Sequence, residues 1–133
     1  MNARHFTTAL GVAALVVFAL SASAGAFAGD EVIARGSFTG KKGHATSGGV
    51  SVVKTAKGTV VVLDPDFSFD GAPDPKLGFG KNGYDKSAKF SVLRSNRGKQ
   101  TYDIPASIDP ADYNEIWVWC ERYSVPLGVA KLK

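Results

Sequence analysis

Cysteine and histidine are scarce in this sequence, and their scarcity excludes several kinds of site. The 133 residues include one cysteine, Cys120, and two histidines, His5 and His44. A single cysteine cannot form an intramolecular disulfide, and a structural zinc site needs four clustered nitrogen, sulfur or oxygen ligands. The sequence therefore excludes a disulfide framework and a structural zinc site.

Charge of one sign is also limited. The formal net charge is +4, from 16 Lys and Arg against 12 Asp and Glu. The tight basic groups, Lys41 with Lys42 and Arg94 with Arg97 and Lys99, lie in stretches rich in Gly, Ser and Asn that are typical of solvated loops. Nucleic-acid-binding domains usually carry a stronger basic patch. We therefore expect no nucleic-acid partner.

The longest apolar run lies at the N-terminus. Arg4 provides a positive charge before an apolar run from Ala9 to Leu20, and small residues follow up to Ala28. A membrane-spanning helix needs about 20 consecutive apolar residues, whereas this three-part order is typical of a secretory signal peptide. We expect cleavage after Ala28, with an earlier cut after Ala24 as the alternative. No stable membrane span is expected after cleavage.

The predicted signal peptide divides the chain into two parts. Residues 1–28 form the leader, and residues 29–133 have the length of one small domain. Such a leader predicts that the mature protein is periplasmic or secreted, in a bacterial setting. Cysteines usually pair in that oxidising compartment, yet Cys120 has no partner in its own chain.

Short runs rich in β-branched and aromatic residues dominate the remainder, and no helical period of comparable strength appears. About seven such runs, separated by turns, predict an all-β domain, a single antiparallel β-sandwich or barrel. A single turn of helix is predicted after Asp109, because Asp is a favoured N-cap and Pro110 suits the first helical position. The predicted strands are residues 32–38, 50–55, 59–63, 88–93, 99–104, 115–120 and 127–132.

Two pairs of these runs predict β-hairpins. Residues 50–55 and 59–63 are joined by a tight turn in which Gly58 supplies a positive φ. Residues 88–93 and 99–104 are joined by a polar stretch and predict a second hairpin.

The run from Glu115 to Cys120 is apolar on both faces. Ile116, Val118 and Cys120 fall on one face, and the two tryptophans fall on the other. A strand of this kind is expected in a central, covered position.

The densest group of carboxylates lies between Asp64 and Asp74. Asp66, Ser68 and Asp70 match the first half of a calcium loop, but Leu77 stands where the bidentate Glu is required. We interpret the segment as a turn-rich crossing whose Phe67 and Phe69 cap the core. A hydrolase triad of His44, Asp66 and a serine has little support, because no Gly-x-Ser-x-Gly motif is present.

Cys120 admits two interpretations from the residues alone. Free cysteine packs as a small hydrophobe, and its face-mates are core residues, which favours a structural, buried thiol. However, Cys120 ends its strand, so the thiol is also placed near the rim of the sheet. There Arg122 would lower its pKa, and Trp117, Trp119 and Tyr123 would shield it or relay electrons.

The C-terminal stretch from Ile116 to Leu132, with its order of aromatic residues, cysteine, glycine, alanine and leucine, resembles the signature of the DM-thirteen domain. This small secreted domain occurs beside DOMON domains in Skeletor-like proteins. Leu127 departs from the pattern, since a phenylalanine is expected there. Further matches are Gly36-Ser37-Phe38, His44 before a glycine, Asp66-Phe67, Pro73-Asp74 and Tyr102-Asp103-Ile104-Pro105.

The resemblance implies an electron-transfer or redox module with Cys120 as its functional residue. Cys120 would act as a bare thiol, through sulfenic acid or a mixed disulfide with a redox partner protein, because the chain has no resolving cysteine. Alternatively it would ligate a prosthetic group such as haem, with His44 across the iron and without covalent attachment, since no Cys-x-x-Cys-His motif occurs.

A non-catalytic extracytoplasmic binding module is the alternative function. In that case the loops 40–49 and 64–83 contact a partner, and Cys120 is a buried structural residue. Whether the domain is an enzyme stays open at this point.

Overall fold

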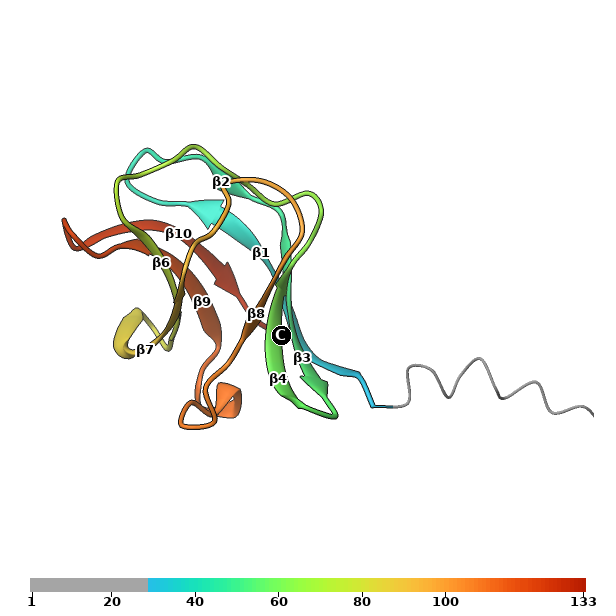
Figure 1. The fold of residues 1–133 in the computed structure, drawn as a ribbon. Helices are drawn as coiled ribbons and strands as arrows, with labels where there is room; N and C mark the ends of the chain where they lie inside the picture. The colour runs from blue at the N-terminus through green and yellow to red at the C-terminus, as the bar shows by residue number, and fades with distance from the viewer. Residues whose placement is uncertain (1–28) are drawn as a thin grey trace, which may run out of the picture.

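The computed structural model describes residues 29–133 as an all-β domain (Figure 1). The expected leader, residues 1–28, and its cleavage site lie outside the described residues. Within the described part, one turn of 3-10 helix, η1 (Pro110–Asp112), accompanies the strands. These are β1 (Glu31–Gly40), β2 (Thr46–Ser47), β3 (Gly49–Thr55), β4 (Gly58–Leu63), β5 (Ser68–Phe69), β6 (Pro75–Gly80), β7 (Tyr84–Val92), β8 (Gln100–Asp103), β9 (Glu115–Cys120) and β10 (Val125–Lys131).

Eight of the strands form one antiparallel sheet that curls into a nearly closed barrel. Their order is β7-β6-β9-β10-β1-β3-β4-β8, while β2 and β5 pair with each other. The end strands β7 and β8 approach through side chains, because the rings of Phe90 and Tyr102 lie 6.2 Å apart between centroids. The backbone N–H of Arg94 also donates to the Tyr102 hydroxyl at 3.0 Å. The predicted all-β class is confirmed, in the barrel form.

The first predicted hairpin and the helical turn are both confirmed. Strands β3 and β4 pair from Val50 opposite Leu63 to Thr55 opposite Gly58. Gly58 has φ of 129°, a value that L side chains adopt only with strain. At η1 the Asp109 carboxylate accepts a hydrogen bond from the backbone N–H of Ala111 at 3.0 Å, as an N-cap residue does.

The second predicted hairpin is wrong, although both of its strands exist. Strand β7 pairs with β6, and β8 pairs with β4 at the opposite edge of the sheet. The chain turns back onto β6 at residues 81–83, where Asn82 and Gly83 have φ of 56° and 136°. The segment 93–99 therefore crosses the seam of the barrel. The pattern of alternating residues carries no information about which edge of the sheet a strand uses.

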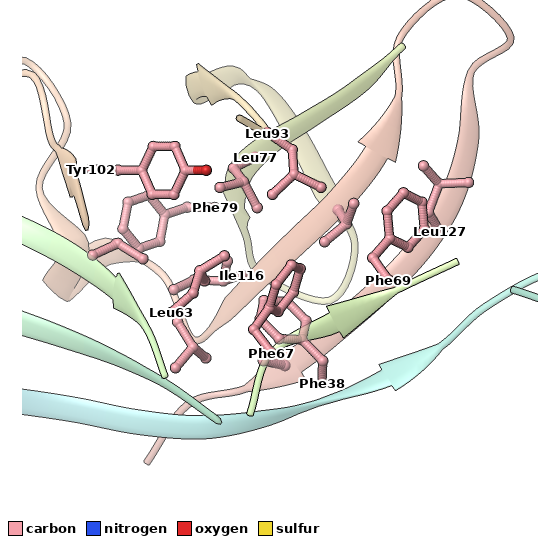
Figure 2. Packing of buried hydrophobic residues seen from close by; sticks show 14 of the residues in the cluster. Phe38, Leu63, Phe67, Phe69, Leu77, Phe79, Leu93, Tyr102, Ile116 and Leu127 are labelled. Carbon is pink, nitrogen blue, oxygen red and sulfur yellow. The ribbon is translucent and has the colours of Figure 1, made fainter. Parts of the chain in front are cut away.

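The apolar side chains point into one interior (Figure 2). Phe67 and Phe69 are each 2% exposed, and the Phe67 ring meets Phe38 edge-on at 5.5 Å between centroids. The interpretation of these two phenylalanines as core residues is confirmed. The labelled members of the interior are Phe38, Leu63, Phe67, Phe69, Leu77, Phe79, Leu93, Tyr102, Ile116 and Leu127.

One end of the barrel carries most of the long connections, and we call it the cap end. Because the strands are antiparallel, the segments 41–48, 64–74, 93–99 and 121–124 all lie there. The small β2–β5 pair belongs to this end, and the Thr46 hydroxyl donates to the carbonyl oxygen of Leu127 at 2.8 Å. Close approach of Thr46 depends on Gly128, where a Cβ would lie 2.7 Å from the Thr46 Cβ.

Candidate functional site

Strand β9 occupies the central position predicted for it, but its outer face is covered only in part. It pairs with β6 on one side and with β10 on the other. Ile116, Val118 and Cys120 are buried, whereas Trp117 and Trp119 are half-buried. The face with the cysteine therefore belongs to the interior, and the tryptophans lie on the outer face of the sheet.

Cys120 combines the two positions that the sequence left open. Its thiol is free and the residue is only 2% exposed, within the core cluster. At the same time Cys120 is the last residue of β9, opposite Pro75 of β6 and Val125 of β10, at the cap end. The four residues that follow it, 121–124, form an exposed turn. The thiol is thus buried directly beneath the rim of the barrel.

A row of alternating charges lies along this rim. Glu121 contacts Lys76 at 3.0 Å and Lys89 at 2.7 Å, and Lys76 also contacts Asp74 at 2.8 Å. The hydrogen bonds from the two lysines hold the pKa of the Glu121 carboxyl below its usual value. Hydrogen bonds to Asp74 and Glu121 raise the pKa of Lys76. Arg122, which the sequence placed beside the thiol, is exposed, and no salt bridge involving it occurs among residues 29–133.

The outer face of β9 carries an aromatic stack that includes an unexpected residue. The rings of Tyr84 and Trp119 are stacked, with centroids 4.6 Å apart and planes 14° apart. Gly78 makes room for this stack, because a Cβ there would lie 2.6 Å from Tyr84 Cε2. Burial, followed by the negative charge of Glu121, raises the pKa of Tyr84 to about 12. Tyr123, by contrast, is 62% exposed and does not take part in the stack.

A cavity of about 140 Å³ lies beside this stack and reaches the turn after Cys120. It is lined by Tyr84, Lys86, Trp119, Glu121 and Ser124. The outer side of the turn is therefore indented, and Glu121 borders both the cavity and the row of charges.

The start of β9 contains a buried carboxylate that sequence analysis missed. Glu115 is 1% exposed and accepts hydrogen bonds from the backbone N–H of Gly83 at 2.8 Å and from the Trp117 indole at 3.1 Å. Lys131 of β10 pairs with the same carboxylate. Burial opposes ionisation of Glu115, but these hydrogen bonds outweigh it and lower the pKa. A strand pattern alone assigns such a residue to solvent, so no signal in the sequence identified it.

His44 lies at the cap end, in the connection between β1 and β2. Its Nδ1 is 2.9 Å from Asp70 Oδ1, and the backbone N–H of Ala45 donates to Asp70 Oδ2 at 3.0 Å. These bonds, first that from Ala45 and then that from His44, lower the pKa of Asp70. The His44 side chain is 28% exposed and its ring lies 5.9 Å from that of Phe69. Among the described residues, no hydrogen bond joins His44 to Cys120.

Asp66, the carboxylate of the hydrolase triad considered with His44, instead accepts a hydrogen bond from the backbone N–H of Gly49 at 2.9 Å. In the part of the chain that the structure describes, no group of three or more His, Cys, Asp or Glu side chains converges as metal ligands do. The same part contains no helix with the length and apolar character needed to cross a membrane.

The arrangement around Cys120 and His44 does not fit a haem. A sulfur that ligates haem iron would need open space for the haem beside it, whereas the Cys120 side chain is enclosed by the packed core. His44 Nδ1 is bonded to Asp70 at the surface, and no buried side-chain nitrogen or oxygen in residues 29–133 lacks a hydrogen-bond partner. We therefore derive no step through haem.

Comparison with known proteins identifies the family. The family model described as Electron transfer DM13 matches residues 37–132, which include all of β2 to β10. No curated protein and no solved structure matched the chain. Because the match covers well over half of the sequence, the chain belongs to the electron transfer DM13 family, as the resemblance indicated.

Proposed function

We propose, from the premise that this chain is an electron transfer DM13 domain, that Cys120 is the group through which it exchanges electrons. Membership of the family supports a redox or electron-transfer module in general. The single observation that carries the specific role is the position of the thiol, free and at the end of a central strand beneath the rim. A cysteine in mid-strand would be far from any segment that opens easily.

The reaction we propose is thiol–disulfide exchange with partner proteins. The Cys120 thiolate attacks a disulfide of an electron-accepting partner, so that a new S–S bond forms, the partner's S–S bond breaks and the second partner sulfur leaves as a thiolate. One thiolate of an electron-donating dithiol protein then attacks Cys120 Sγ and displaces the acceptor, which leaves as a thiolate. The second donor thiolate closes the donor disulfide and releases Cys120 as a thiolate. Two electrons pass from the donor, which becomes a disulfide, to the acceptor.

Burial sets a condition on this chemistry. A disulfide sulfur has to approach Cys120 Sγ in line with its own S–S bond, and a residue that is 2% exposed does not permit this approach. The thiol therefore reacts from a locally opened state in which the rim has moved. Exposed turns such as residues 121–124 are the segments that open at low free-energy cost.

We further propose that the domain acts in the bacterial periplasm or outside the cell. The signal-peptide pattern of residues 1–28 supports this location. An oxidising compartment supplies the protein disulfides that the proposed exchange requires.

A binding module with a structural cysteine is the second candidate, and burial of Cys120 in the core cluster is the observation that favours it. In this case the thiol reacts only when the whole domain unfolds. The Gly-rich and Asp-rich connections at the cap end would then contact the partner.

The kinetics of thiol modification separate the two candidates. The rate of reaction of Cys120 with a disulfide reagent is measured in the purified protein at urea concentrations below the unfolding transition. Local opening gives a rate that depends only weakly on urea, whereas global unfolding gives the steep dependence of complete denaturation. If the logarithm of the modification rate rose with urea concentration as steeply as expected for complete unfolding, the redox role would be overturned.

Variants at Cys120 provide the functional arm of this experiment. Cys120→Ala and Cys120→Ser should both remain folded by circular dichroism, with a moderate loss of stability from the lost packing. Neither variant should form the mixed disulfides that we expect the wild-type chain to form with periplasmic or secreted proteins. Retention of electron transfer in the folded Ala variant would exclude Cys120 as the redox group.

A further inference from the structure

A single carboxylate ties the turn after Cys120 to two neighbouring strands. Glu121 is the first residue of the turn, and its two carboxylate oxygens contact Lys76 of β6 at 3.0 Å and Lys89 of β7 at 2.7 Å. Lys76 is shared with Asp74, which directly precedes β6. The start of β6, the end of β9 and Lys89 within β7 thus contribute to one row of charges.

The row of charges is continuous with the backbone hydrogen bonds that join β6 and β9 beside Cys120. The N–H of Glu121 donates to the carbonyl oxygen of Asp74 at 3.1 Å, so the same two residues are joined by main chain and, through Lys76, by side chains. Cys120 precedes Glu121 and lies opposite Pro75, which follows Asp74. Separation of the rim beside Cys120 therefore separates Glu121 from its lysines.

We infer that these ion pairs form an electrostatic latch that keeps the Cys120 thiol closed and sets the rate at which it can react. The inference rests on the proposed function, because a partner sulfur has to reach Cys120 Sγ. The side chains of Glu121 and Lys89 are 46% and 39% exposed. Partly exposed ion pairs of this kind are individually weak and are screened by salt. The latch therefore favours the closed state of the rim but still allows it to open.

Two substitutions of opposite charge test the latch. Glu121→Gln and Lys89→Gln break the same ion pair, and we measure the rate of Cys120 modification in each with the uncharged reagent 4,4′-dithiodipyridine. A latch predicts that both variants react faster than wild type, by about 1.5- to fivefold for each ion pair that the substitution removes. A direct effect of charge on the thiol predicts opposite directions, because loss of a carboxylate lowers a nearby thiol pKa and loss of an ammonium raises it.

Coupling and salt sharpen the test. The double variant should react no faster than the faster single variant, because the second substitution has no intact pair to break. Added sodium chloride should raise the wild-type rate towards that of the variants and change the variants less. Lys86→Gln is the matched control, since Lys86 lies on the same strand, is exposed and has no salt bridge among the described residues.

The latch is overturned if Glu121→Gln and Lys89→Gln change the rate in opposite directions, or if neither exceeds Lys86→Gln. This outcome is distinguishable from failure of the proposed function, because the reagent reports access to the thiol without any redox partner. If the latch were confirmed but Cys120→Ala still transferred electrons, only the redox role of Cys120 would be refuted. Loss of electron transfer in Cys120→Ala without a latch would refute only the present inference.

Discussion

The two ends of strand β9 are held in different ways. At its start, the Glu115 carboxylate is 1% exposed and accepts hydrogen bonds from a backbone N–H and an indole N–H, and it also pairs with an ammonium group. At its end, the turn after Cys120 is held by Glu121, whose side chain is 46% exposed and whose partners are lysines. A buried network thus fixes one end, and ion pairs near solvent hold the other.

This difference separates stability from reactivity along a single strand. Removal of one member of a buried network leaves donors without partners, which costs far more than the loss of an exposed ion pair. The end with Glu115 therefore anchors β9 to β10 and to the turn between β6 and β7. On the proposed function, we expect the end with Cys120 to open more readily than the end with Glu115, because exposed ion pairs are weaker than a buried network.

Loss of the buried carboxylate is expected to have the largest effect. Glu115→Ala leaves the N–H groups of Gly83 and Trp117 without their acceptor, so the free energy of unfolding should fall by about 2 to 4 kcal/mol. Urea denaturation monitored by tryptophan fluorescence measures this change. Glu31→Ala, at an exposed position, is the control and should stay within about 0.5 kcal/mol of wild type. Equal effects of the two substitutions would refute the anchoring role of Glu115.

A smaller effect is expected at the stack that lies between the two ends. In Gly78→Ala the new Cβ would meet Tyr84 Cε2 at 2.6 Å and the Lys89 Cα at 3.0 Å, so the Tyr84 ring has to move away from Trp119. We expect a loss of about 1 to 3 kcal/mol and a changed near-ultraviolet circular dichroism spectrum. The same substitution in a Tyr84→Ala background should cost clearly less, because the ring is absent. An undiminished cost there would place the strain elsewhere.

Most of the strands were predictable from the sequence because period-two patterns report which residues face a core. Strand β6 was missed, because Pro75–Gly80 lies within residues 64–83, which the sequence analysis assigned to a loop. This reasoning placed Ile116, Val118 and Cys120 on one face of β9 and the tryptophans on the other, and it located the turn at Gly58. It failed for the pairing of β7 and β8, because the partner of a strand depends on how the whole sheet closes. The alternation of apolar and polar residues within one strand carries no information about its partner strand.

The site was predictable only in part, for the same physical reason. A lone cysteine is visible in the sequence, and so is its place at the end of a strand. Tyr84 and Lys76 come from strands that are distant in the chain, and only the fold brings them to β9. Glu115 occupies a position on the outer face that a strand pattern assigns to water, although the Trp117 side chain and the turn at Gly83 bury it.

The smallest effect we predict is a difference between the two ends in acid. Glu115 and Glu121 both have a pKa lowered from the ordinary value of 4.5, so each contributes stability that is present above that pH and is lost as the pH falls through the pKa of the folded state. Glu115→Gln should therefore flatten the decrease in urea midpoint between about pH 5 and pH 3. Glu121→Gln should flatten the decrease less, because solvent screens the ion pairs of Glu121. Moderate salt should remove most of the contribution of Glu121 to the pH dependence but not that of Glu115. If Glu121→Gln flattened the decrease as strongly as Glu115→Gln, the two ends of β9 would be held equally, and local opening at Cys120 would lose its physical basis.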